Sequence, residues 1–222
     1  MHTHSGRCGL ALGLMLSPFM QTAVTAAEPV VDNVGLTLKP AGARSIWQAG
    51  IGEGFVAGAM SFEAKLSRGF GVSALGSLVA HDFWLSHAQL GYVPFDVWGE
   101  GRWYGGNLEL TGQLMAGFQD QPESAYFFAL DVGARYHFAT GGRLMPFIAG
   151  NVGVSATDIG GPDLSGVFQF NEQIGAGVRY FINDRQAIVL EYFLQHISNA
   201  GISYPNKGAN THFVSLGFAW LF

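Results

Sequence analysis

Cysteine is almost absent from this chain, because Cys8 is the only one among its 222 residues. A single cysteine excludes a disulfide framework and a metal site built from cysteines. Charged residues are also scarce, at 12% of the chain compared with about 25% in a typical soluble domain. The formal net charge of −5 argues against a nucleic acid as partner, because phosphate binding requires an excess of lysine and arginine.

Long apolar runs are missing beyond the N-terminus. The mean hydropathy is +0.23, yet no later stretch approaches the roughly 18 unbroken apolar residues that a spanning helix needs. High apolar content without such runs leaves two fold classes. One is a secreted β-sandwich, and the other is a membrane β-barrel, in which alternation of apolar and polar residues hides the hydrophobicity.

The N-terminus indicates the compartment. Arg7 precedes an apolar run that extends to Met20, and small residues just before Glu28 suit a cleavage at that point. This pattern is typical of a secretory signal peptide at residues 1–27 rather than of a membrane anchor. The glycine-rich residues 28–60 have weak strand character, so we expect an N-terminal segment of undefined structure outside the barrel.

Residues 61–222 consist of alternating stretches separated by turn residues, the pattern of strands with one polar face. We predict eight strands, at residues 61–74, 83–93, 107–118, 125–138, 146–157, 167–181, 188–198 and 211–222. The second stretch alternates poorly, so its faces are not assigned. The others have an aliphatic face with aromatic residues toward the ends, which predicts an all-β fold, an eight-stranded antiparallel transmembrane β-barrel.

The polar faces of these strands would point into the barrel. Their charged residues include Glu109, Asp131, Arg135, Arg179 and Glu191. Unpaired charges would be costly in such an interior, so we expect these residues to pair. A secreted sandwich would instead bury the aliphatic faces, and periodicity alone does not exclude it. The ending F-A-W-L-F, with Phe222 on the apolar face, resembles the C-terminal signature of bacterial outer-membrane proteins and favours the barrel.

The seventh predicted strand carries the candidate site. His196 and Ser198 are two residues apart and therefore share a face with Leu194 and Tyr192, the apolar face. Barrel termini normally lie in the periplasm, so this pair is expected at the outer end of the strand, toward the lipid of the outer leaflet. The next strand brings Asn210 back beside the pair, on its own lipid-facing side.

These residue types suit ester hydrolysis. A serine hydroxyl is a weak nucleophile until a base removes its proton, and His196 is the only base nearby. Asn210 is placed to hold the imidazole through its amide oxygen. Asn199, Asn206 and the backbone N–H of Gly201 are within reach as donors to an oxyanion. The lipid-facing position predicts an acyl ester whose chains stay in the membrane, although histidine and serine are also ordinary residues at a membrane interface.

Two motifs on and after this strand, H-I-S-N-A-G-I at 196–202 and P-N-K-G-A-N at 205–210, resemble the lipid A 3-O-deacylase (PagL) family of outer-membrane acyl hydrolases. The likeness extends through P-F-I-A-G-N-V-G-V at 146–154 and F-N-E-Q-I-G-A-G at 170–177. The resemblance implies hydrolysis of the 3-position acyl ester of lipid A in the bacterial outer membrane. It also implies that His196 and Ser198 are catalytic, with Asn199, Gly201 and Asn206 around the oxyanion.

The chain departs from this family at one position. Family members have a glutamate as third member of the triad where this chain has Asn210, and residues 192–222 contain no aspartate or glutamate. A Ser-His-Asn arrangement resembles that of outer-membrane phospholipase A, which has a different barrel. Glu172 is the alternative acid, because it lies near the outer end of the neighbouring strand on the lipid-facing side. We expect Asn210 rather than Glu172 to orient His196.

Three functions remain to be separated: a lipid A deacylase, a phospholipase or other lipid esterase with the same site, and a non-enzymatic small barrel. The H-I-S-N-A-G motif favours an enzyme, because a structural barrel has no need of it. The expected partners are lipopolysaccharide and the other lipids of the outer membrane. No metal or cofactor is expected, since the histidines follow no ligand spacing. The residues leave open whether the barrel is a monomer or a homodimer.

Overall fold

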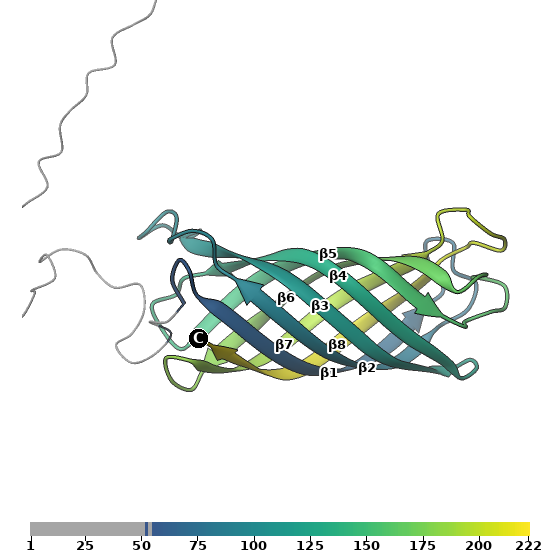
Figure 1. Cartoon of the computed structure of the whole chain (residues 1–222), viewed down its shortest axis with the longest axis horizontal. Helices are drawn as coiled ribbons and strands as arrows, with labels where there is room; N and C mark the ends of the chain where they lie inside the picture. Colours follow the sequence, from purple (N-terminus) through teal and green to yellow (C-terminus); the bar gives the residue numbers. More distant parts are fainter. Residues whose placement is uncertain (1–51, 53–54) are drawn as a thin grey trace, which may run out of the picture. The chain divides into compact units, whose positions relative to one another are not determined.

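The computed structural model describes residue 52 and residues 55–222, and the predicted signal peptide lies outside them. The described chain forms a closed barrel of antiparallel strands in which each strand pairs with its sequence neighbours and β1 closes on β8 (Figure 1). The strands are β1 Met60–Val72, β2 Asp82–Tyr92, β3 Gly106–Gln121, β4 Ala125–Phe138, β5 Leu144–Thr157, β6 Phe168–Phe181, β7 Gln186–Ser198 and β8 Ala209–Leu221. The predicted eight-stranded barrel is confirmed. No helix among the described residues is long and apolar enough to cross a membrane.

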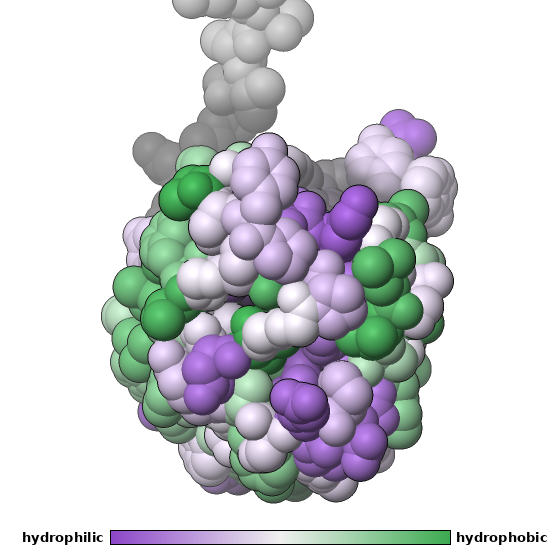
Figure 2. All heavy atoms as spheres, turned by 90° about the vertical axis from the view of Figure 1, so that its right-hand side faces the viewer, coloured by the Kyte–Doolittle hydropathy of each residue, from purple (hydrophilic) through white to green (hydrophobic). Residues whose placement is uncertain are grey.

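The barrel has two distinct ends. The C-terminus lies at one of them, here called the near end, together with the connections 93–105, 139–143 and 182–185 (Figure 1). The opposite end, here called the distal end, carries the connections 73–81, 122–124, 158–167 and 199–208. Viewed onto the distal end, hydrophobic residues lie around the rim and hydrophilic residues gather over the middle (Figure 2).

Alternate residues of every strand point outward, and most of these are apolar. Large side chains on this surface include Leu66, Leu114, Val132, Ile148, Val152, Ile174 and Leu216. Leu66 is 66% exposed and Ile174 is 67% exposed, which would be unfavourable in water for so continuous a surface. In a membrane this apolar surface contacts lipid chains, and closure of the sheet leaves no unpaired strand edge within the hydrocarbon.

The interior has apolar clusters at both ends and a polar belt between them. The near-end cluster includes Phe55, Val93, Met145, Phe147, Phe181 and Leu221, and the distal-end cluster includes Phe83, Leu85, Met115, Phe127, Phe193 and Phe213. Phe55 belongs to the segment that we expected outside the barrel, yet its side chain is fully buried in the near-end cluster. The two regions also explain why β2 alternates poorly in sequence. Its inward residues are apolar at the distal end, Phe83 and Leu85, and polar in the belt, His87 and Gln89.

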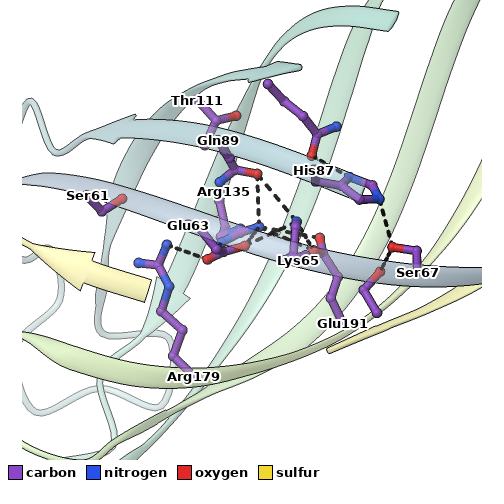
Figure 3. Close-up of polar contacts among 12 residues, drawn as sticks. Ser61, Glu63, Lys65, Ser67, His87, Gln89, Thr111, Arg135, Arg179 and Glu191 are labelled. Carbon is purple, nitrogen blue, oxygen red and sulfur yellow. Dashed lines mark hydrogen bonds and ion pairs between the residues drawn. The ribbon is translucent and has the colours of Figure 1, made fainter. Parts of the chain in front are cut away.

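Charged side chains in the polar belt form one network (Figure 3). Glu63 is its centre, because it contacts Lys65 at 3.1 Å, Arg135 at 3.0 Å and Arg179 at 3.1 Å. Glu191 accepts from Lys65 at 2.5 Å and Arg135 at 3.4 Å, and Glu109 pairs with Arg179 at 3.1 Å. Three cations therefore face three carboxylates, so the charges of this network balance.

The expected pairing of interior charges is confirmed for Glu109, Arg135, Arg179 and Glu191. For Asp131 the expectation is wrong, because this carboxylate meets amides instead of a cation. It accepts hydrogen bonds from Asn171 at 2.8 Å and from Gln113 at 3.3 Å. Interior side-chain amides can satisfy a carboxylate through hydrogen bonds alone. The alternation of residues along a strand does not tell whether a buried carboxylate meets amides or a cation.

Removing the central carboxylate should destabilise the barrel strongly. The variant Glu63→Ala leaves three buried cations with two carboxylates, and breaking a buried ion pair in this way costs about 3–5 kcal/mol. The measurement is urea unfolding in detergent micelles, followed by the shift in electrophoretic migration between folded and heated barrel. Glu100→Ala, an exposed glutamate in the 93–105 connection, is the matched control and should leave the unfolding midpoint unchanged. Equal midpoints for both variants would contradict a stabilising role of the network.

Candidate functional site

His196 and Ser198 lie near the distal end of β7 and point to the outside of the barrel. They share this face with the exposed residues Leu194 and Tyr192, while the intervening Ile197 is buried in the interior. Both site residues are half-buried, so they are neither in the core nor fully surrounded by lipid. Their placement follows from strand geometry, because positions two apart in a strand share one face.

Asn210 lies on β8 directly opposite His196 in the strand register. Its Oδ1 accepts a hydrogen bond from His196 Nδ1 at 2.7 Å, and its Nδ2 donates to the backbone oxygen of Ala74 at 2.7 Å. Because a backbone carbonyl can only accept, the amide oxygen must face the histidine. His196 then carries its proton on Nδ1 and leaves the Nε2 lone pair available, which is the tautomer that a general base needs.

The connection 73–81 covers Asn210. Although Asn210 points outward, it is only 6% exposed, because Ala74 lies over it. The sequence pattern did not indicate Ala74, since its contribution is a backbone carbonyl and any residue type carries one.

Gly208 allows the chain to pass close to the imidazole. A Cβ at this position would lie 2.5 Å from Cε1 of His196, and its φ of +78° is one that favours glycine. The glycine in N-K-G-A-N is the sequence signal for this close approach, although its purpose is visible only in the structure.

Ser198 has a free hydroxyl in this structure. Within residues 55–222, no hydrogen bond is formed by its side chain, to His196 or to any other group. Its register partner on β6 is Phe170, an outward-facing residue that is 37% exposed. The hydroxyl is thus open to the lipid side and is not committed to holding the fold.

Glu172 lies on the other side of His196, opposite it in the register between β6 and β7. Its side chain is exposed and forms no hydrogen bond or ion pair with any residue in the described part of the chain. The two candidates for the third position therefore flank the histidine on adjacent strands. The contact to the imidazole comes from Asn210.

The connection 199–208 holds the three predicted oxyanion residues. The Asn199 side chain is buried and donates to Ser165 O at 2.9 Å, while its Oδ1 accepts from the N–H of Gly201 at 2.9 Å. The N–H of Asn199 in turn donates to Oδ1 of Asn206 at 2.9 Å. Within residues 55–222 the Nδ2 of Asn206 has no partner, so this amide is the donor left over when the loop is folded.

An apolar groove of about 530 Å³ lies on the outer surface beside His196. Its apolar walls include Val152 of β5, Ile174 of β6, Leu194 of β7 and Leu75 of the 73–81 connection. His212 also lines it and is hydrogen-bonded through Nδ1 to the hydroxyl of Tyr192. Among the described residues, no group of three or more histidine, cysteine, aspartate or glutamate side chains is arranged to hold a metal ion.

The chain is similar to proteins of known function. A model of the family described as lipid A 3-O-deacylase (PagL) matches residues 69–219. Lipid A deacylase PagL of Pseudomonas aeruginosa is 30% identical over 123 residues, which cover 52% of this chain and 68% of that protein.

Among solved structures, Neisserial surface protein A is similar in fold, with a TM-score of 0.53 and 14% identity over 73% of this chain and 98% of that one. The crystal structure of the outer membrane enzyme PagL has a TM-score of 0.47 and 20% identity, covering 69% of this chain and 97% of that chain. The match to Neisserial surface protein A concerns the barrel fold alone.

The family model extends from the end of β1 into β8 and includes His196, Ser198 and Asn210. Together with the sequence identity to the Pseudomonas enzyme, this match is sufficient to assign the family. The chain belongs to the lipid A 3-O-deacylase (PagL) family, which makes it a hydrolase of the outer membrane.

Proposed function

We propose that this barrel hydrolyses the acyl ester at the 3-position of lipid A, with Ser198 as nucleophile, His196 as general base and Asn210 as the group that orients the imidazole. The observation that carries the proposal is the hydrogen bond from His196 Nδ1 to Asn210 Oδ1 at 2.7 Å. It leaves Nε2 unprotonated on the same face of β7 as Ser198, whose hydroxyl forms no hydrogen bond within the described residues.

The reaction proceeds in two steps. In the first, His196 Nε2 takes the proton of Ser198 as Oγ attacks the ester carbonyl, and the bond to the sugar oxygen then breaks as the sugar oxygen takes that proton from the imidazole. In the second, His196 removes a proton from water as the water oxygen attacks the acyl-enzyme carbonyl. The bond to Ser198 Oγ then breaks, Oγ takes that proton from the imidazole, and the fatty acid is released. The Nδ2 of Asn206 donates to the oxyanion that forms in both steps.

The serine and the histidine must approach each other for the first step. They share one face of β7, so rotation about χ1 of Ser198 brings Oγ toward the imidazole without a change in the backbone. Hydrogen bonds between catalytic groups are often long in enzymes without substrate and shorten in the reactive complex. The absence of this contact in the described chain is therefore compatible with the proposed roles.

The location suits a substrate that remains in the membrane. Barrel termini normally lie in the periplasm, which puts the distal end with His196 and Ser198 at the outer surface. The apolar groove beside His196 is lined by Val152, Ile174 and Leu194, which can hold an acyl chain by burying its methylene groups. The ester carbonyl then lies at the polar end of the groove, where the chain emerges beside the catalytic groups.

Asn210 orients the imidazole but supplies no charge to it. A carboxylate in this position stabilises the imidazolium that forms during the reaction, whereas a neutral amide contributes only a hydrogen bond. The proposal therefore includes a slower chemical step than a triad with glutamate would support.

Loss of the nucleophile should abolish deacylation and leave the barrel intact. For Ser198→Ala we expect activity to fall about 1,000-fold or more, because no other group replaces the attacking oxygen. The measurement is mass spectrometry of lipid A from cells that express each variant, with folding checked by heat-modifiable migration. Ser86→Ala is the matched control, because Ser86 is an exposed, outward-facing serine of β2 and should not matter.

The same experiment separates the competing functions. Loss of one acyl chain from lipid A only with an intact Ser198 supports the deacylase. Fatty acids released from phospholipids, with lipid A unchanged, would instead indicate a phospholipase. A folded wild-type barrel that changes neither lipid would contradict an enzymatic role.

Substitution of the two residues that flank His196 tests the third position. Asn210→Ala should lower the rate on the order of 100-fold, because the imidazole loses the acceptor that fixes its tautomer. Glu172→Ala should retain activity within a few-fold, since Glu172 makes no contact with the imidazole. Rates of lipid A deacylation by purified variants in detergent micelles provide the measurement. An inactive Glu172→Ala beside an active Asn210→Ala would assign the role to Glu172.

A further inference from the structure

An asparagine in the third position creates a requirement that a carboxylate does not have. Its side chain has an acceptor on one side and a donor on the other, whereas both oxygens of a carboxylate accept. If the amide of Asn210 were reversed, its NH₂ group would face Nδ1 of His196. The imidazole would then carry its proton on Nε2, where it could not take the proton of Ser198. Something must therefore hold the amide in one orientation.

The backbone oxygen of Ala74 does so, through the 2.7 Å hydrogen bond from Asn210 Nδ2. Ala74 itself is exposed and lies in the 73–81 connection, between a strand end and Gly76, whose φ is +106°. Within the connection, the N–H of Ser77 donates to the same Ala74 oxygen at 3.1 Å, so the position of this carbonyl depends on where Ser77 is held. The orientation of the Asn210 amide therefore depends on the position of the 73–81 connection.

A buried aspartate from another loop holds the 73–81 connection. Asp163, in the 158–167 connection, is fully buried, and its Oδ1 accepts from the N–H of Leu78 at 2.7 Å. Its Oδ2 accepts from the N–H of Val79 at 3.0 Å and the hydroxyl of Ser77 at 3.1 Å, and lies 3.0 Å from Nε2 of His81. One carboxylate therefore ties down four consecutive or nearly consecutive residues that follow Ala74.

The same residue also reaches the other side of the site. The backbone oxygen of Asp163 accepts from the N–H of Lys207 at 2.6 Å, immediately before Gly208, which lies against the ring of His196. The backbone oxygen of His81 accepts from Thr211 Oγ1 at 3.0 Å, next to Asn210 in the chain. Asp163 is therefore linked to the segments that precede and follow the imidazole contact, although it does not touch the imidazole.

The charge of Asp163 suits this task. Burial raises the pKa of its carboxyl, but hydrogen bonds from Val79, Leu78, His81 and Ser77 outweigh burial and hold that pKa below its ordinary value. Because this pKa is lowered by folding, the ionised Asp163 carboxylate stabilises the fold at pH values above the usual range of aspartate. This stabilisation is lost only as the pH falls below that range. The carboxylate is ionised at neutral pH and accepts all of these hydrogen bonds.

We propose that Asp163 is a positioning residue for hydrolysis: it fixes the 73–81 connection so that the Ala74 carbonyl keeps the Asn210 amide oxygen on His196. This inference rests on the proposed function of His196 and Asn210. Asp163 touches neither the ester nor the imidazole, so its effect passes through the orientation of one amide.

The test is a double-mutant cycle in purified barrels, with Asp163→Ala, Asn210→Asp and their combination. Asp163→Ala should lower kcat about tenfold or more with a smaller change in KM, because the groove walls Val152, Ile174 and Leu194 lie on strands and only the wall at Leu75 belongs to the connection that Asp163 fixes. In the Asn210→Asp background the same substitution should cost far less, because a carboxylate needs no Ala74 carbonyl to present an acceptor. Unchanged kcat in Asp163→Ala, or equal losses in both backgrounds, would overturn the proposal.

A matched control and a second variant complete the cycle. Asp158→Ala removes an exposed aspartate of the same connection, which accepts a hydrogen bond from the N–H of Tyr126 at 2.8 Å, and should leave kcat unchanged. If Asp163→Ala does not yield a folded barrel, Asp163→Asn replaces it in the same cycle, because it keeps the size of the side chain and removes the charge. The outcomes that support or overturn the proposal are the same for both variants.

A measurement without substrate separates this inference from the proposed function. The ¹⁵N chemical shifts of the His196 ring distinguish the two neutral tautomers in micelles. We expect Nδ1 protonated in the wild type and a mixture of tautomers in Asp163→Ala. A wild-type barrel that does not deacylate lipid A would overturn the proposed function, whereas an unchanged tautomer in Asp163→Ala would overturn the positioning role alone.

Discussion

A lipid bilayer offers no hydrogen bonds to the protein inside it, and this constraint governs the whole structure. Backbone groups are satisfied by closing β1 onto β8, which removes the free edges of the sheet. Most charged side chains of the inward faces pair with one another, with Glu63 in contact with all three cations of the belt. Asp131 instead accepts hydrogen bonds from amides. Apolar clusters at both ends separate this belt from water, so the network is buried.

The candidate site is subject to the same constraint on the outer surface. His196, Ser198 and Asn210 are polar groups on the lipid-facing side of the barrel, and a donor or acceptor left unmatched there is costly. The loops at the distal end solve this problem for Asn210, which points outward yet is buried beneath the 73–81 connection. Both ends of its amide have a partner, whereas Ser198 keeps an open hydroxyl and His196 an available Nε2.

The asparagine in this site carries no charge and acts through the orientation of its amide. A glutamate stabilises a histidine cation in either rotation, whereas an amide is useful in one orientation only. The surrounding loops provide that orientation through Ala74, and Asp163 and Ser165 of the 158–167 connection hold the loops on both sides of the histidine. With asparagine in place of glutamate at position 210, the orientation of the imidazole therefore depends on connections that are distant in sequence.

The sequence by itself determined the strands, their outward faces and the membership of a family of outer-membrane enzymes. These features depend on alternation and on short motifs, and alternation fixes that His196 and Ser198 share one face of β7 because strand geometry is local. The faces of β2 could not be assigned from the sequence, since apolar Phe83 and Leu85 share its inward face with His87. Only the tertiary structure decided that Asn210 rather than Glu172 contacts the imidazole, that Asp131 meets amides, and that Ala74 and Asp163 support the site. Those contacts join residues far apart in the chain, through backbone atoms and strand register, and no pattern of residue types encodes them.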